Sequence, residues 1–175
     1  MGYSCQQLVV LNTINGDRYA RKLFPRKHQF DIKNSHLKPK AGTGLWTSTY
    51  TPHDDTPSDW YAWCTYNQVD WAGKEGILIT VKRKARICTI DSYNDLESLL
   101  KQYPYYSDRL TNWNGNPKKF LNYMIMKKDF DIIHLTMKGH HDIHFTDTDY
   151  DLYGWDCECS LHLNNVIQAY KKVNL

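Results

Sequence analysis

The sequence feature that most constrains the fold is the run at residues 153–163, near the C-terminus, because it alternates like a single β-strand. Successive side chains of a strand point to opposite faces. The run therefore predicts a packed face of Cys157, Cys159, Leu161 and Leu163 and a polar face of Asp156, Glu158, Ser160 and His162. A carboxylate in the middle of such a strand suits a catalytic acid at an edge or a cleft. An ordinary solvent-facing polar face is the alternative, and this segment taken alone favours it.

Chain length and composition indicate one globular domain. A chain of 175 residues can bury one sizeable core but is short for two, so we expect residues 1–175 to form a single domain. The hydrophobic share of 41% is typical of a folded protein, while the mean hydropathy is negative and no apolar run is long enough to span a bilayer. The first residues lack the basic and apolar regions of a signal peptide. These features predict a soluble protein of the cell interior, with no membrane partner.

The cysteine pattern and the net charge limit the kinds of site and partner that the chain is expected to have. The five cysteines form no CxxC pair, and their odd number favours reduced, packed thiols over a disulfide framework or a paired-cysteine zinc site. The formal charge of +3 is too small by itself to predict a nucleic-acid partner, although it is compatible with an anionic ligand.

Hydrophobic periodicity predicts an α+β domain. Besides residues 153–163, strands are expected at residues 7–13, 45–50, 77–81, 86–90 and 131–136. Three helices are expected: one with Thr56 as its N-cap, one capped by Ser92 and stopped by Pro104, and one over residues 116–127. Residues 18–40 and 138–151 are expected to be loops. The first helix brings Trp60 and Trp63 to one face, which is typical of a core stripe and less often of a ring-stacking platform.

Histidines gather at residues 140–144, where His140 and His144 would face one way on a helix or a strand. A transition-metal site is conceivable there. No HExxH motif is present, and no HxE is followed by PCxxC, so a surface turn is favoured and no metal is predicted. A nucleic-acid interface is a weaker hypothesis, based on the basic residues Lys82, Arg83, Lys84, Arg86, Lys118 and Lys119.

One constellation of residues can carry a reaction. A carboxylate at position 158 can stabilise an oxocarbenium-like transition state at a sugar carbon, and hydroxyls from a neighbouring strand can fix its orientation. The run Thr47-Ser48-Thr49 offers such hydroxyls. The sequence does not show that the two strands are adjacent.

Two unusual tryptophan-containing motifs carry a family resemblance that spans residues 38 to about 167. The matching residues are Lys38-Pro39, Gly44-Leu45-Trp46-Thr47-Ser48, Trp60, Trp63-Cys64, Ile90-Asp91 and Tyr153-Gly154-Trp155-Asp156-Cys157-Glu158. In these the chain resembles a family of mostly uncharacterised phage and bacterial proteins. That family is similar, more distantly, to the ADP-ribosyltransferases, in which a split, mixed or antiparallel β-core binds NAD and a glutamate near the start of a late strand is catalytic.

The resemblance implies roles for individual residues. Glu158 would hydrogen-bond the nicotinamide ribose, and Asp156, two residues earlier, would orient the acceptor. Thr47, Ser48 and Thr49, with the adjoining Trp46, would support the glutamate and the bound nucleotide. The fold's first motif is an Arg or His on the first strand, and residues 8–13 carry neither, so His36 or Lys38 is the expected substitute for gripping NAD.

The resulting expectation is an NAD-dependent ADP-ribosyltransferase that uses NAD as a substrate and modifies a macromolecular acceptor, either a host protein or a nucleic acid. The alternative is a non-catalytic phage accessory module that binds a nucleotide or a host protein. For a phage-encoded protein, the expected location is the cytoplasm of the bacterial host cell.

Overall fold

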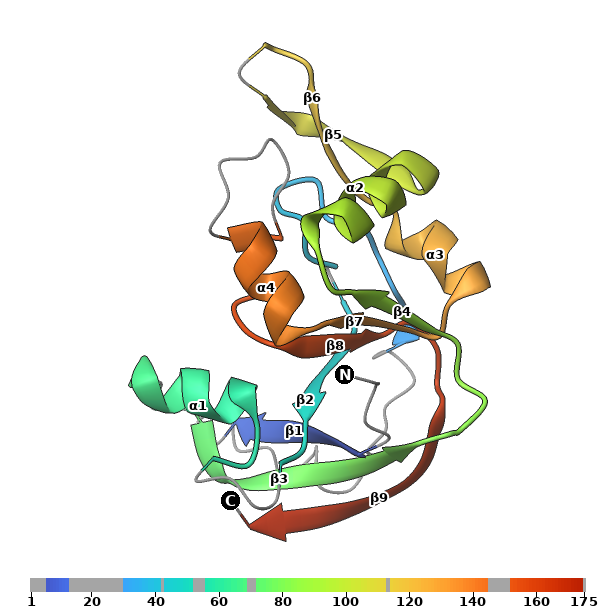
Figure 1. Cartoon of the computed structure of the whole chain (residues 1–175). Coiled ribbons are helices and arrows are strands. Elements are labelled where there is room, and N and C mark those ends of the chain that lie inside the picture. Colours follow the sequence, from blue (N-terminus) through green and yellow to red (C-terminus); the bar gives the residue numbers. More distant parts are fainter. Residues whose placement is uncertain are drawn as a thin grey trace.

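The fold was analysed in a computed structural model that describes residues 6–12, 30–41, 43–51, 56–68, 72–112, 114–144 and 152–174. Within these ranges the chain forms nine strands and four helices (Figure 1). The predicted α+β class is confirmed. In the same ranges, no helix has both the length and the apolar character needed to cross a membrane.

Seven strands make the main sheet, in the order β4-β7-β8-β2-β1-β3-β9. Their bounds are β1 (Gln6–Asn12), β2 (Leu45–Thr49), β3 (Ala72–Val81), β4 (Ile87–Ile90), β7 (Ile132–Leu135), β8 (Cys159–His162) and β9 (Ile167–Asn174). β4 and β7 run parallel, and the other neighbours are antiparallel, so the sheet is mixed. β3 and β4 follow one another in the chain but lie far apart in the sheet.

The sheet divides along β2. The first part of β2 pairs with β8, where Thr47 lies opposite Ser160, and its end pairs with β1, where Thr49 lies opposite Gln7. Figure 1 shows β2 crossing between a group formed by β4, β7 and β8 and a group formed by β1, β3 and β9. The middle of β2 therefore lies where the two groups part.

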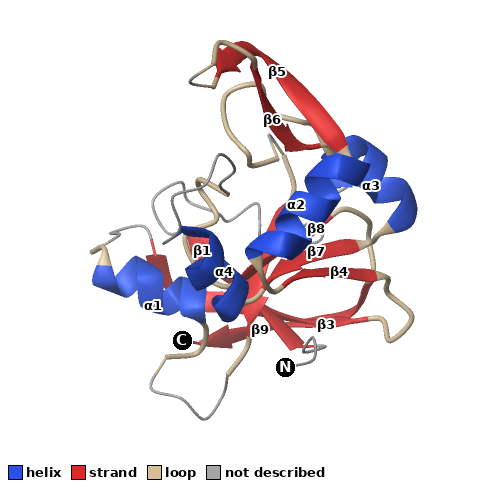
Figure 2. Cartoon of the chain, turned by 45° about the horizontal axis from the view of Figure 1, so that its top comes forward, coloured by secondary structure: helices blue, strands red, loops and turns tan. Residues whose placement is uncertain are grey.

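Helices cover the β4-β7-β8 group on one side. These are α2 (Tyr93–Gln102), α3 (Tyr123–Asp129) and α4 (Met137–His144), whereas α1 (Asp59–Tyr66) lies beside β2 and β3 (Figures 1 and 2). A separate two-stranded ribbon, β5 (Pro104–Thr111) with β6 (Pro117–Leu121), extends beyond α2.

Trp155 belongs to the larger core cluster and is fully buried. Its indole N–H donates to the carbonyl of Pro39 at 3.2 Å, and its ring meets that of Trp46 edge-on with the centroids 4.7 Å apart. A buried indole N–H usually finds such an acceptor, because leaving it without one is costly. This cluster also contains the thiols of Cys88, Cys157 and Cys159, and Cys64 of α1 is buried as well. All four are free, as predicted for packed cysteines, and Cys5 lies outside the described residues.

Four predicted elements are wrong in ways that have a local cause. The single strand expected over residues 153–163 is reduced to β8, because the chain turns at Gly154, with a φ of 90°, before it enters the sheet. Residues 116–127 are not one helix, because Pro117 pairs with Thr111 in the ribbon and Asn122 caps α3 through the backbone N–H of Ile125. The N-cap of α1 is Ser58 rather than Thr56. The predicted loop at 138–151 begins as the helix α4, and residues 145–151 lie outside the described residues. The predicted loop at 18–40 is described only from residue 30 onward.

Gly139 permits close packing of α4 against the end of β4. A Cβ added here would overlap the backbone oxygen of Ile90 and lie 3.1 Å from the Cα of Asp91. Alanine normally stabilises a helix over glycine by about 1 kcal/mol. Here the obstacle is backbone, which cannot move aside cheaply, so Gly139→Ala is expected to lower the free energy of unfolding by roughly 2 kcal/mol.

Urea unfolding measures this effect. The control is Gly115→Ala, where an added Cβ meets nothing within 4 Å and only the positive φ of 75° opposes alanine. Unchanged or increased stability of Gly139→Ala would contradict the packing of α4 on β4.

Candidate active site

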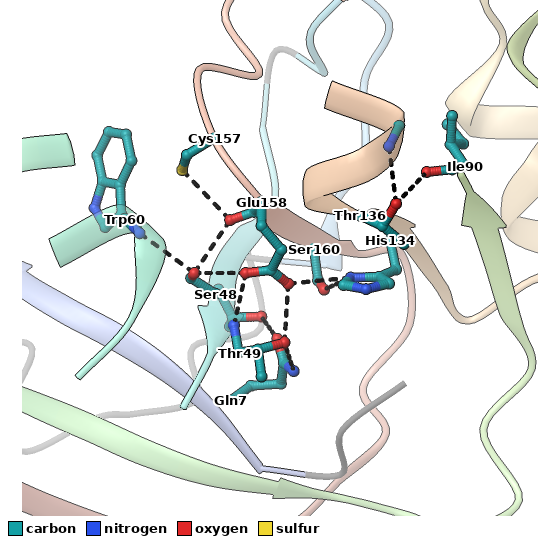
Figure 3. Close-up of polar contacts among 12 residues, drawn as sticks. Gln7, Ser48, Thr49, Trp60, Ile90, His134, Thr136, Cys157, Glu158 and Ser160 are labelled. Atoms are coloured by element: carbon teal, nitrogen blue, oxygen red, sulfur yellow. Dashed lines mark hydrogen bonds and ion pairs between the residues drawn. The ribbon is translucent and has the colours of Figure 1, made fainter. Parts of the chain in front are cut away.

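The carboxylate of Glu158 lies at the point where the sheet divides, one residue before β8. Three donors from β2 hold it: the Ser48 hydroxyl donates to Oε2 at 2.7 Å, the Thr49 backbone N–H donates to Oε2 at 3.0 Å, and the Thr49 hydroxyl donates to Oε1 at 2.9 Å (Figure 3). Ser48 and Glu158, 110 residues apart in the chain, thus converge on one site.

The division of the sheet explains why a carboxylate is needed there. Backbone N–H groups of a strand point alternately to its two sides. The N–H of Tyr50 donates to Gln6 of β1 at 3.2 Å, so the N–H of Thr49 points toward β8. The β2–β8 register ends at Thr47, and the side chain of Glu158 accepts this N–H in place of a strand carbonyl. A buried backbone donor without a partner would cost about 1–3 kcal/mol.

Ser48 connects Glu158 to the start of α1. Its hydroxyl oxygen accepts the backbone N–H of Trp60 at 3.3 Å while its proton is donated to Glu158. The first N–H groups of a helix lack partners within the helix and carry a partial positive charge. The α1 terminus therefore polarises Ser48 in the direction that favours an anion at Glu158.

Burial and hydrogen bonding act on Glu158 in opposite directions. The residue is 6% exposed, and removal from water raises the pKa of its carboxyl group, whereas the bonds from Ser48 and Thr49 lower it, with a raised pKa as the net result. A raised pKa is typical of functional carboxylates, although structural networks produce it too.

His134 of β7 contacts the other side of the carboxylate. Its Nδ1 lies 3.3 Å from Glu158 Oε1 and 3.0 Å from the Ser160 hydroxyl. Burial lowers the pKa of His134 to about 4, against smaller opposing effects of Asp91 and a backbone bond to Cys159. The ring is therefore neutral near pH 7, and its contact with Glu158 is a polar contact between a neutral ring and a carboxylate rather than an ion pair.

The solvent-facing interpretation of the polar face is wrong. Glu158, Ser160 and His162 are all buried, and so is the opposite face of β8. The reason is that β8 lies between β7 and β2 inside the sheet and is not an edge strand.

The other predicted site residues, which are Asp156, Trp46, His36 and Lys38, lie in four different surroundings. Asp156 is half-buried and lies near the ring of His140, whose pKa it raises slightly against the lowering effect of burial. Trp46 packs against Trp155 and carries the ammonium group of Lys40 over its ring at 4.6 Å. His36 bonds to Tyr105 and to Asp108, at 2.7 Å, and so faces β5 rather than Glu158. Lys38 is exposed.

Sequence reasoning missed two buried polar residues near Glu158: His134, which contacts its carboxylate, and Gln7, which reaches it through Thr49. Gln7 of β1 is fully buried and donates from Nε2 to the Thr49 hydroxyl at 3.2 Å. A polar residue at the start of an apolar first strand, and a histidine in the middle of the apolar run Ile132–Leu135, were the available signals.

Two alternative sites can also be located. His140 and His144 share one side of α4, with ring centroids 4.4 Å apart, yet no cluster of three potential metal ligands occurs in the part of the chain that the structure describes. The basic residues divide between the β3–β4 turn and the distant ribbon (Figure 1), and Arg86 is paired with Asp131 at 2.9 Å. They do not form one continuous basic surface.

Comparison with known proteins gives no relative: no protein-family model, no curated protein and no solved structure matches the chain. The functional interpretation therefore depends on the geometry of the site and on the motif resemblance.

Proposed function

We propose that this chain is an NAD-dependent ADP-ribosyltransferase in which Glu158 is the catalytic residue. The observation that carries the proposal is the contact between Glu158, just before the late strand β8, and the hydroxyl-rich end of β2. The sequence resemblance assigned those same positions to the catalytic glutamate and its supporting strand. The division of the sheet at β2 agrees with the split β-core that the resemblance implies.

The main task of the protein in this reaction is to stabilise positive charge on the ribose of NAD while nicotinamide leaves. The bond between the nicotinamide nitrogen and the ribose C1′ breaks, and its electron pair leaves with neutral nicotinamide. The ribose then carries oxocarbenium-like positive charge, which an anionic Glu158 near the ring stabilises in a site of low dielectric. A nucleophile of the acceptor attacks C1′ and loses its proton to solvent or a base. The products are the ADP-ribosylated acceptor, nicotinamide and a proton.

Asp156 has the complementary role in this proposal. It precedes Glu158 by two residues and is half-buried, so it lies closer to solvent than Glu158 does. An acceptor must approach from solvent, and a carboxylate at that position can orient a hydroxyl or amino nucleophile. His36 and Lys38 are weaker candidates for NAD binding, because His36 faces the ribbon.

Label transfer tests the proposal. The wild-type protein is incubated with NAD labelled in its adenylate portion and with a bacterial lysate as the source of acceptor. We expect label in a protein or nucleic-acid fraction, and its loss with Glu158→Gln. Digestion of that fraction by protease or by nuclease identifies the acceptor class. Failure to bind or cleave NAD, with or without lysate, would overturn the proposal.

A non-catalytic binding module is the second candidate, and one observation favours it. Glu158 is almost fully buried, and all three of its donors come from the protein itself, as in a structural network. Such a module would bind its nucleotide or host protein stoichiometrically and leave it unchanged. Glu158→Gln would then keep its full biological effect.

A further inference from the structure

A chain of polar side chains leads from Glu158 through β2 and β1 to His162 of β8. The Thr49 hydroxyl donates to Glu158 Oε1 at 2.9 Å, and the Gln7 amide nitrogen donates to Thr49 Oγ1 at 3.2 Å. The Thr47 hydroxyl donates to Gln7 Oε1 at 3.0 Å and lies 3.1 Å from His162 Nε2. Gln7, Thr47 and His162 are all buried.

The direction of every bond in this chain follows from the charge at one end. An ionised carboxylate only accepts hydrogen bonds, so the single proton of Thr49 Oγ1 must point to Glu158. Thr49 can then only accept from Gln7, which turns the amide oxygen toward Thr47. Thr47 gives its proton to that oxygen and must accept from His162. His162 therefore carries its proton on Nε2.

We propose that Gln7 and His162 are positioning residues of Glu158, joined to it by a directed hydrogen-bond chain that pairs the ionised carboxylate with the Nε2–H tautomer of His162. Gln7 is the central member, because its amide presents a donor to Thr49 and an acceptor to Thr47 at fixed positions. Gln7, on the first strand β1, thus orients the Glu158 carboxylate through Thr49.

The other ring nitrogen of His162, Nδ1, does not determine the tautomer, so the hydrogen-bond chain at Nε2 does. Among the described residues, none forms a hydrogen bond with Nδ1 of His162, which is buried. Burial also lowers the pKa of His162 to about 3, so the ring carries a single proton at neutral pH. In the part of the chain that the structure describes, no competing partner fixes that proton from the Nδ1 side.

Replacing Glu158 by glutamine is expected to reverse the direction of each hydrogen bond in this chain. The backbone N–H of Thr49 requires an oxygen at the Oε2 position, so the amide nitrogen of the variant occupies the Oε1 position. Its two protons face Thr49 Oγ1 and the neutral ring of His134. Thr49 must then accept there and donate to Gln7, which flips its amide, and Thr47 donates to Nε2 of His162. His162 changes to the Nδ1–H tautomer.

The tautomer of His162 is measured from the ¹⁵N chemical shifts of its ring, assigned with a His162→Gln variant, at pH 7 in the absence of any ligand. We expect Nε2–H in the wild type and Nδ1–H in Glu158→Gln. An Nδ1–H tautomer in the wild type, or the same tautomer in both proteins, would overturn the proposal.

A second variant keeps the test decisive if Glu158→Gln does not fold. Thr49→Val removes the link next to Glu158 but preserves the backbone N–H, and it should leave His162 as a mixture of tautomers. The matched control is Thr65→Val on α1, whose hydroxyl bonds only to Tyr61 of the same helix in the described contacts. A pure Nε2–H tautomer in Thr49→Val would also contradict the chain.

The predicted effect of this chain on catalysis rests on the proposed function, whereas the predicted tautomer of His162 does not. Under that function, Gln7→Leu should lower kcat for NAD cleavage about tenfold with KM nearly unchanged, corresponding to one pKa unit of carboxylate stabilisation. If NAD is not cleaved by the wild type while the tautomers behave as stated, the transferase proposal fails alone. If Glu158 is essential for NAD cleavage but the tautomer does not change, the chain fails alone.

Discussion

Glu158→Gln is expected to lower kcat for NAD cleavage by about 10²–10³-fold, the usual loss when one group that stabilises transition-state charge is removed. Glutamine keeps the size of the side chain and an oxygen for Ser48 and for the Thr49 N–H. It lacks the negative charge that the ribose requires. NAD binding should change much less than kcat, since the interaction is strongest in the transition state.

The fold should survive this substitution. Burial raises the pKa of the Glu158 carboxyl group, so the ionised form is disfavoured in the folded state and a neutral amide removes that penalty. The matched control is Glu97→Gln, a partly exposed glutamate paired with Lys101 on α2, which should leave both kcat and stability unchanged. Cleavage by Glu158→Gln at the wild-type rate would remove the catalytic role of Glu158.

Stability is expected to fall steeply between pH 6.5 and pH 4 because His134 and His162 are buried as neutral rings. Their pKa values in the folded state are about 4 and about 3, against an ordinary value of 6.5. Below pH 6.5 the unfolded chain takes up protons that the folded chain does not, so stability is full above 6.5 and is lost as the pH falls. At pH 5 each ring costs roughly 2 kcal/mol relative to pH 8.

Glu158 acts in the opposite direction. Its pKa is raised by folding, so it contributes stability at low pH that is lost as the pH rises through its pKa in the folded state. Asp131, whose pKa the Arg86 guanidinium and its other bonds hold at about 2, titrates below this window. The two histidines together therefore outweigh the single carboxyl group over the range from pH 6.5 to pH 5.

Urea unfolding at pH 8 and pH 5 measures the effect. His162→Gln, which keeps a donor for Thr47, should reduce the difference between the two pH values by about 2 kcal/mol. The control is His141→Gln at an exposed position on α4, which should leave the difference unchanged. Equal stability of the wild type at both pH values would show that the buried rings take up protons without unfolding.

The sequence was informative where a pattern is local. A run of β-prone residues identified β2, the apolar run identified β7, and Ser92 with the leucine spacing identified α2. The pairing of residues 47–49 with Glu158 was expected only through the motif resemblance, because nothing local shows which strands are neighbours.

The missed features depend on contacts between distant segments. Glutamine and histidine are polar and often lie at the surface. Only the order of the strands shows that Gln7 and His134 are buried within the sheet. α4 buries only Gly139 and Ile143, so its sequence lacks the apolar period that marks a helix. The ribbon was missed because Pro104 and Pro117 are ordinary helix signals that here occupy strand positions.

Release of nicotinamide from NAD by the wild-type chain tests the central claim most directly. The assay measures free nicotinamide at neutral pH, first with water as the only acceptor and then with bacterial lysate. The proposed function predicts one nicotinamide for each ADP-ribose, free or attached to an acceptor, and release that is about 10²–10³-fold slower with Glu158→Gln. NAD that remains intact under both conditions, or equal release by the two proteins, would contradict it.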